Sequence, residues 1–396
     1  MNQFQTIVVA LLKNALLPDK NQPAIPDDFD WEAVLKLGHE HQIIPLLYYG
    51  IENLCLKIPE GILQKMRQSV LANAIIDETQ RYEAGEVTKS FEANHIDYVV
   101  LKGTKMKQLY PYTEMRSMGD VDILIRKNQY GQIRPIMQSL GFQEQQETDH
   151  EYIWDKRNAL HIELHKQLIS SRNEDFCGYF GDGWKLAEPQ SGSACCYALS
   201  DEDDFTYMFA HFAKHYRAAG IGIRHTIDLW VYLRAKQELN HERIRCAFQA
   251  LGLDLFYENV IRTIQVWFDG QPPDAITECI TNKIFNSGSF GVRNAEVISS
   301  AIRHLNSVKA FKRAKRERLR RVLFPSHENM CLKYKFLKKA PLLLPVMWMV
   351  RIFVAFIFKR ETVKEEREKL KMLSTETMDA YQYELSLVSL DFHLKK

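Results

Sequence analysis

A change of periodicity constrains this chain more than any other feature of its sequence. Residues 1–95 space their apolar side chains at three and four positions, as amphipathic helices do, and the same spacing returns from about Asp203. Residues 96–170 instead contain short apolar or alternating runs that are typical of strands. We therefore expect an α+β fold, in which a small mixed sheet is flanked by N-terminal and C-terminal helical subdomains.

Four runs predict the strands of this sheet. They are YVVL at 98–101, VDILI at 121–125, and the pair HEYIW and ALHIELH, whose separation by 155–158 predicts a hairpin. Helices are predicted over 29–51, 61–94, 104–110, 128–140, 205–216, 225–237, 241–251 and 255–268. Segments 188–193 and 270–273 have the composition of linkers. The division expected from these patterns is 1–95, a sheet core at 96–190, a helical subdomain at 191–330 and a helical tail at 331–396.

Composition excludes several classes of protein. A formal net charge of +2 over 396 residues gives no global case for nucleic-acid binding. Seven cysteines without a CxxC spacing favour a reducing compartment over a disulfide framework or a zinc knuckle. The apolar N-terminal stretch is interrupted by Lys13 and follows no basic region, so we interpret it as an amphipathic helix rather than a signal peptide. A cytoplasmic location is expected.

Asp120 and Asp122 are two positions apart in GDVDILI, on a predicted strand. Alternate side chains of a strand share a face, so both carboxylates should point the same way while Val121 and Ile123 face the core. Two carboxylates a few ångströms apart repel each other unless a cation lies between them. Hard oxygen ligands suit Mg²⁺ or Mn²⁺. The motif therefore predicts a divalent-metal site.

Glu163 in HIELH is the best candidate for a third carboxylate, because it alternates with Ile162 and Leu164. If its strand pairs beside the Asp-Val-Asp strand, three carboxylates converge and could hold two metal ions. An alternative is a hydrolytic zinc or iron site made by His161, Glu163 and His165 on one strand face. His165 could instead support the carboxylates from behind.

Lys102-Gly103-Thr104 closes a predicted strand and opens a predicted helix. Glycine permits close approach of the backbone to a phosphate, and the N–H groups that follow favour an anion. Lys102, Lys105 and Arg116 could add positive charge. The plainer alternatives are that Lys102 is a solvent-exposed lysine and that Arg116 pairs with Glu114 or an acidic neighbour.

Four residues of the later helices form a second candidate group for the pocket. His211 and His215 are four apart, as are Arg224 and Asp228, so each pair shares a helix face. They could close over a nucleotide or an acceptor, or they could form a buried ion pair and interhelical hydrogen bonds.

The order of these motifs resembles the nucleotidyltransferase superfamily typified by DNA polymerase beta. More closely, LKG, YP, GDVDILI and IELH, together with HEHQIIPLLYYGI, HFAKHYRAAGIGIRHTIDLWVYL and LFPS, resemble the bacterial "uncharacterised nucleotidyltransferase" family over about residues 30–330. The resemblance implies that Gly103 and Thr104 cradle phosphates, that Asp120 and Asp122 bind metal, and that Glu163 is the third carboxylate. Two departures are a threonine where serine is commoner and the fifteen residues between Thr104 and Asp120.

The C-terminal third contains a basic run at 303–321 and an apolar segment, PLLLPVMWMVRIFVAFIF, at 341–358. Arg351 and two prolines argue against simple membrane spanning. The apolar segment could lie on an anionic membrane surface as a peripheral contact, but a core or partner-contacting helix is favoured. Residues 361–371 should form an exposed charged helix.

These observations predict a metal-dependent nucleotidyltransferase that moves a nucleoside monophosphate from an NTP, its co-substrate, to an unknown acceptor hydroxyl or phosphate. Mg²⁺ (or Mn²⁺) would be the cofactor. The alternative is a catalytically silent nucleotide-binding or assembly protein of the same fold. Such a protein could also be located at a membrane surface.

Overall fold

The computed structural model describes residues 1–18, 22–156, 160–171, 173–218, 220–288, 320, 323–327, 330–331, 334–358 and 375–391. These residues fall into two compact units. The first contains residues 1–216, 220–288 and 388–391, and the second contains 217–218 and the described residues from 320 to 387. Every candidate site residue named above lies in the first unit. The four-part division expected from the sequence stays a prediction.

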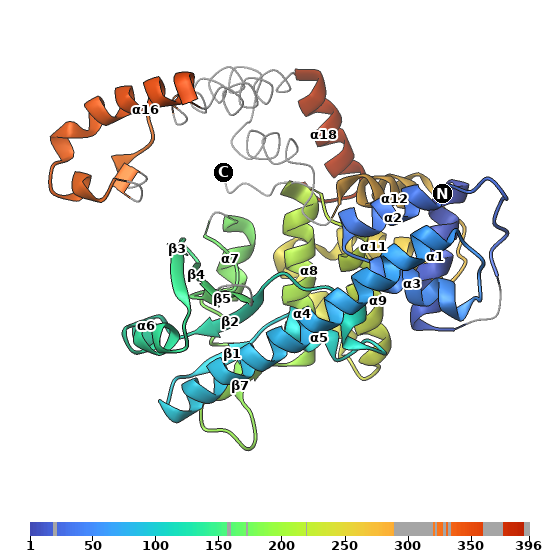
Figure 1. The fold of residues 1–396 in the computed structure, drawn as a ribbon, viewed down its shortest axis with the longest axis horizontal. Helices are drawn as coiled ribbons and strands as arrows, with labels where there is room; N and C mark the ends of the chain where they lie inside the picture. The colour runs from blue at the N-terminus through green and yellow to red at the C-terminus, as the bar shows by residue number, and fades with distance from the viewer. Residues whose placement is uncertain are drawn as a thin grey trace. The chain divides into compact units, whose positions relative to one another are not determined.

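The N-terminal part of the first unit is helical, as the spacing predicted. Its helices are α1 (Gln3–Leu16), α2 (Trp31–His41), α3 (Ile44–Asn53) and the long α4 (Glu60–Ala93) (Figure 1). Asp30 caps α2 by accepting a hydrogen bond of 2.9 Å from the backbone N–H of Ala33. Gln42 ends α2 with a left-handed φ of 55°, which turns the chain directly into α3.

A seven-stranded mixed sheet forms the centre, in the order β3-β4-β5-β2-β1-β7-β6. Its strands are β1 (Tyr98–Val100), β2 (Val121–Ile125), β3 (Gln143–Glu147), β4 (Glu151–Lys156), β5 (Leu160–His165), β6 (Ala187–Pro189) and β7 (Cys196–Leu199). β4 and β5 form the predicted antiparallel hairpin. β1 pairs antiparallel with β2 and parallel with β7. The order therefore places β2 at the middle of the sheet.

Three strands of the sheet, β3, β6 and β7, escaped sequence reasoning. β3 reads QEQQE, an exposed edge strand with no apolar alternation to reveal it. The segment 188–193, which we interpreted as a linker, instead contains the end of β6 and the turn into β7. Only pairing with a neighbouring strand makes either segment β-structure.

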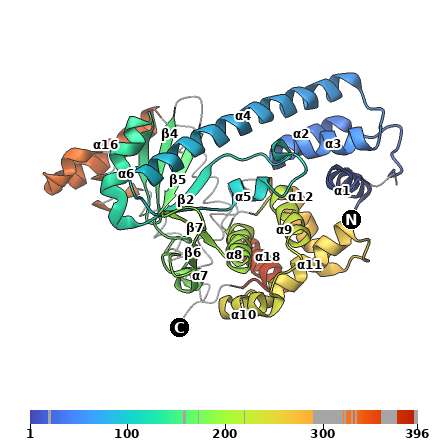
Figure 2. The same cartoon turned by 90° about the horizontal axis from the view of Figure 1, so that it is seen from below.

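The two faces of the sheet have different roles. On one face, apolar side chains from β2, β4 and β5 form a core with α4 and with α6 (Tyr130–Ser139). Figure 2 shows α4 crossing this side of the sheet and α8 (Asp201–Ala218) on the other side. Val121, Ile123 and Ile125 belong to the core, so Asp122 faces away from it. The opposite face of the sheet, on the side of α8, is not part of this core and can therefore present polar side chains.

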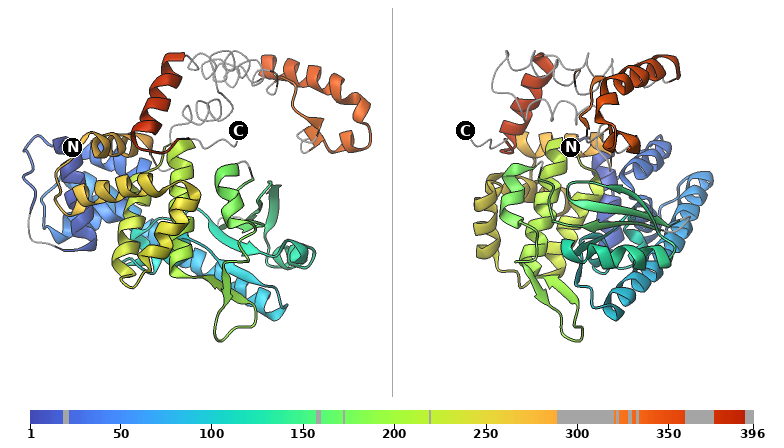
Figure 3. Two further views of the ribbon diagram at one scale, coloured as in Figure 1. Left: turned by 180° about the vertical axis from the view of Figure 1, so that it is seen from behind. Right: turned by 90° about the vertical axis from the view of Figure 1, so that its left-hand side faces the viewer.

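The remaining elements of this unit are short helices around the sheet and a second group of long helices. They are α5 (Gly103–Lys107), η1 (Thr113–Met115), η2 (Lys127–Gln129), α7 (Glu174–Phe180), α9 (Ile223–Ala235), α10 (His241–Leu251), α11 (Asp254–Phe268) and α12 (Ala275–Ser287). The helices from α8 to α11 follow the predicted ranges closely. α1 packs against α11, and Gln5 donates a 3.0 Å hydrogen bond to Asn282, so the first and later helices lie side by side (Figure 3).

The second unit contains η3 (Lys335–Lys338), η4 (Pro341–Leu343), α16 (Leu344–Phe358) and α18 (Thr375–Leu387). Met347 and Trp348 of α16 pack against a small core formed by Met330, Cys331 and Leu337. Other apolar side chains here are exposed, among them Leu342, Met349 and Phe353. In the described part of the chain, no helix combines the length and the apolar character needed to cross a membrane. The membrane-surface and partner-contact interpretations of 341–358 stay predictions.

The basic run at 303–321 lies outside the described residues except for Arg320. The charged helix expected at 361–371 also lies outside them.

Candidate active site

Asp122 and Glu163 are brought together by strand pairing. β2 and β5 run parallel, with Asp122 directly opposite Glu163 in the register. Both residues alternate with core side chains, so both carboxylates leave the sheet on the polar face. Asp120 precedes β2 by one residue and is half-buried, whereas Asp122 is buried. The strand neighbours on which the prediction for Glu163 depended are therefore present.

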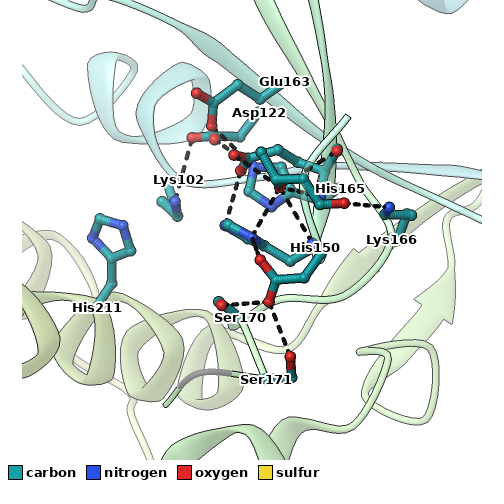
Figure 4. A network of polar contacts seen from close by, with 12 residues as sticks. Lys102, Asp122, His150, Glu163, His165, Lys166, Ser170, Ser171 and His211 are labelled. Carbon is teal, nitrogen blue, oxygen red and sulfur yellow. Dashed lines mark hydrogen bonds and ion pairs between the residues drawn. The ribbon is translucent and has the colours of Figure 1, made fainter. Parts of the chain in front are cut away.

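His165 joins these two carboxylates. Its Nε2 lies 2.8 Å from Oδ1 of Asp122 and 3.5 Å from Oε2 of Glu163. One ligand atom from each of the three residues lies within 4.8 Å of the others, a spacing that could hold a metal ion. Figure 4 shows the three side chains converging, with His150 beside His165 and Lys102 reaching Asp122. His165 therefore contacts both carboxylates directly, and its supporting role stays a prediction.

The three carboxylates lie in different electrostatic environments, which shift their pKa values in different directions. Burial and the negative charges of Asp122 and Glu163 raise the pKa of Asp120. Burial would also raise the pKa of Asp122, but Lys102 and the His165 hydrogen bond lower it to about 2. Hydrogen bonds from His161 and His165 overcome burial and hold the pKa of Glu163 well below its usual range. Asp122 and Glu163 are therefore ionised near neutral pH, beside a third carboxylate that they repel.

This donor set fits a divalent cation. Burial lowers the pKa of His165, but its bonds to Asp122 and Glu163 raise that pKa to about 9, so the imidazole is positively charged at neutral pH. Its Nδ1 is buried without a hydrogen-bond partner among the described residues. Carboxylate oxygens suit Mg²⁺ or Mn²⁺, and those of Asp122 and Glu163 converge, whereas Asp120 is outside the converging group. A metal ion bound by the imidazole would have to displace its proton, because a ligating histidine is neutral. The cluster thus attracts positive charge.

The alternative site made of His161, Glu163 and His165 forms only in part. His161 lies 3.5 Å from Glu163, but its Nδ1 contacts Asp155 at 2.5 Å on the neighbouring strand. His161 is absent from the residues whose ligand atoms converge. His161 therefore contacts Glu163 without belonging to the described cluster, whose third member is Asp122.

Lys102, Gly103 and Thr104 occupy the junction of β1 and α5. Lys102 has a positive φ of 31°, unusual for a residue with a side chain, and its Nζ lies 3.5 Å from Oδ2 of Asp122. A Cβ on Gly103 would lie 2.7 Å from Sδ of Met118, so a larger residue here would require that side chain to shift. Lys102 and Gly103 line the cavity described below, whereas Thr104 is not among its lining residues. The phosphate-binding roles of these residues stay predictions.

Arg116 is held by Asp228 through two hydrogen bonds, of 2.8 Å from Nε and 2.9 Å from Nη2. Tyr110 donates a third hydrogen bond, of 2.7 Å, to the same carboxylate. Asp228 does not pair with Arg224 on its own helix, and Arg116 pairs with this acidic residue rather than with Glu114. Arg224 instead donates to the carbonyl of Ser117 at 2.6 Å and to the side chain of Gln42.

His211 and His215 share one face of α8, as their spacing predicted. Their Nε2 atoms are 3.1 Å apart, so one ring donates and the other accepts a hydrogen bond. Burial, together with nearby lysines, lowers the pKa of both residues well below 6.5, and both are therefore neutral at physiological pH. They face the cavity as polar, uncharged groups.

A cavity of about 330 Å³ brings these groups together. The first unit's helical parts and the sheet all contribute to its lining, which includes every candidate residue except Thr104, Lys105 and His161. Sequence reasoning missed five of its polar residues: Gln42, His150, Glu151, Lys214 and His225. Lys214 could have been found, because it lies three positions after His211 on the same helix. A second cavity, of about 510 Å³, shares Lys102, Met106 and Met208 with the first.

The mixed sheet thus places acidic side chains of neighbouring strands beneath a helical layer, beside a Lys-Gly turn. A family model described as "Uncharacterised nucleotidyltransferase" matches residues 27–269, more than half of the chain. This protein belongs to that family. None of the curated proteins matches the chain significantly. Among solved structures, the antibiotic-resistance factor ANT(2'')-Ia matches with 10% identity and a TM-score of 0.33, over 49% of this chain and 100% of that one. A similarity of this size carries no argument about activity.

Proposed function

We propose that this protein transfers a nucleoside monophosphate from an NTP to an acceptor hydroxyl or phosphate in a metal-dependent reaction. The observation that carries this proposal is the register of β2 and β5, which sets Asp122 beside Glu163 on the polar face of the sheet. Membership of the nucleotidyltransferase family supports the transferase class. Mg²⁺ (or Mn²⁺) is the cofactor that the carboxylate ligands favour.

Asp120, Asp122 and Glu163 are proposed as both the catalytic and the metal-binding residues. The bound cation would neutralise charge on the triphosphate and on the attacking oxygen. In the reaction, an acceptor oxygen bonds to the α-phosphorus, the bond from that phosphorus to the bridging oxygen breaks, and pyrophosphate leaves. The depressed pKa of Glu163 makes it a weak base, so a metal-ligand role fits it better than proton abstraction. The acceptor proton would pass to water.

Lys102, Gly103, Thr104 and Arg116 are proposed to bind the triphosphate beside β1. Lys102 pairs with Asp122 across 3.5 Å, so a metal ion on Asp122 would release the lysine toward a phosphate. Arg116 is fixed by Asp228 and keeps Nη1 near the carbonyl of Gly103, at 3.4 Å. His165, His211, His215, Arg224 and Asp228 complete the proposed pocket.

The test is incubation of the full chain with each labelled NTP, Mg²⁺ and cell lysate, followed by identification of the labelled product. We expect one NTP to label an acceptor and release pyrophosphate, and Asp122→Asn to abolish both. Absence of labelling and of pyrophosphate release with every NTP would refute the enzyme. Mg²⁺-dependent NTP binding without turnover would instead identify a catalytically silent nucleotide-binding protein.

A further inference from the structure

Four lysine and arginine side chains line the cavity that contains the carboxylates. Three of them are engaged within the protein: Lys102 with Asp122, Arg116 with Asp228, and Arg224 with Gln42 and Ser117. The fourth, Lys214, makes neither a hydrogen bond nor an ion pair with any described residue, although it is only partly exposed. An unpaired cation inside a cavity is unfavourable unless a ligand compensates its charge.

Lys214 and Lys102 share one carboxylate, Asp122, but Lys214 also lies near a carboxylate of β4. The charges that act on Lys214 are those of Lys102, which repels it, and of Glu151, Asp122 and Glu163, which attract it. Lys102 belongs to the junction of β1 and α5, on the other side of β2 in the sheet order. Burial nevertheless lowers the pKa of Lys214, to about 8, so part of its charge is already suppressed. An anion placed beside it would restore that charge.

We propose that Lys214 binds an anionic group, a phosphate or a carboxylate, of the acceptor molecule. This inference rests on the proposed function, which places the triphosphate beside Lys102 and Gly103 and leaves the Glu163 side for the acceptor. His211 and His215, which flank Lys214 on α8, add neutral hydrogen-bonding groups for the rest of that molecule. A hydroxyl of an acceptor held at Lys214 would then be directed toward the carboxylates.

Inorganic phosphate serves as the probe, because the acceptor is unidentified. The full chain is first saturated with Mg²⁺ and an α,β-methylene NTP, which fills the triphosphate site without turnover, and phosphate is then titrated by calorimetry. The four nucleobases are tried in turn. We expect phosphate to bind this complex, Lys214→Gln to weaken that binding at least about tenfold, and Lys214→Arg to retain it.

Lys236→Gln is the matched control, since Lys236 lines the second cavity and pairs with Asp201 at 2.9 Å. It should change neither phosphate nor analogue binding. Unchanged analogue affinity in Lys214→Gln shows that the variant is folded. Weakened analogue binding would instead assign Lys214 to the triphosphate and overturn the inference, as would unaltered phosphate affinity. A parent protein that binds no analogue with Mg²⁺ would refute the proposed function, and the inference with it.

Discussion

Asp122 of β2 and Glu163 of β5 stand directly opposite each other in a parallel register, and His165 contacts both carboxylates. In a register shifted by one residue, one of these carboxylates would point into the apolar core. The site is therefore fixed by the same hydrogen-bond ladder that holds the middle of the sheet together.

Asp122→Asn should remove most metal binding and transferase activity. The substitution keeps the size of the side chain but removes a charge that a cation needs, so we expect activity to fall by about 10²-fold or more. Binding of Mn²⁺, followed by its electron paramagnetic resonance signal, should weaken in parallel. Glu147→Gln, on the exposed edge strand β3, is the control and should leave both unchanged. Full Mn²⁺ affinity in Asp122→Asn would contradict the proposed ligand set.

The buried pair of Arg116 and Asp228 should be essential for stability. Asp228→Ala leaves a buried guanidinium without its counter-charge, so the free energy of unfolding should fall by about 3–5 kcal/mol. Asp97→Ala breaks the more exposed pair with Arg126 and should cost less than about 1 kcal/mol. Urea denaturation measures both. If both variants lost a similar free energy of unfolding, burial would not increase the contribution of the Arg116–Asp228 pair to stability.

His41 should make the protein less stable at acidic pH. Its Nδ1 accepts from the N–H of Ile223 and its Nε2 donates to the carbonyl of Phe285, each at 3.1 Å, which requires the neutral ring. Burial lowers the pKa of His41 below 6.5. The unfolded chain therefore binds a proton that the folded chain excludes, and stability falls as the pH drops below about 6.5, by up to about 1.4 kcal/mol per pH unit.

Urea denaturation between pH 7.5 and pH 5.5 tests this prediction for His41. His41→Gln should flatten the dependence of unfolding free energy on pH, whereas His39→Gln, on an exposed position of the same helix, should not. An equal slope in the parent and His41→Gln would show that His41 does not contribute.

Gly50 should tolerate no side chain. A Cβ at this position of α3 would lie 2.1 Å from the carbonyl oxygen of Leu11, a backbone atom of α1 that cannot move aside. We expect Gly50→Ala to lower the free energy of unfolding by about 3 kcal/mol. Gly85→Ala, in α4 with no atom within 4 Å of the new Cβ, should raise it by about 0.5–1 kcal/mol. Thermal unfolding distinguishes the two, and a stabilised Gly50→Ala would contradict the packing.

Local patterns in the sequence determined which segments are helices and strands and which strand face is polar. Side-chain direction alternates within one strand, so local spacing is sufficient to predict the face of each carboxylate. Asp122 lies between the apolar Val121 and Ile123, and Glu163 lies between the apolar Ile162 and Leu164. The polar edge strand β3 and the short strands β6 and β7 were not predicted, since pairing rather than periodicity makes them strands.

Tertiary structure alone decided which of these faces meet. Asp228 pairs with Arg116, 112 positions away, instead of with Arg224 on its own helix, and Lys214 enters the cavity without a described partner. Long-range pairing depends on how helices and strands pack, and packing energy is spread over many apolar contacts that no local spacing records. The sequence therefore specified the carboxylates of the site, whereas the fold selected the cations that surround them.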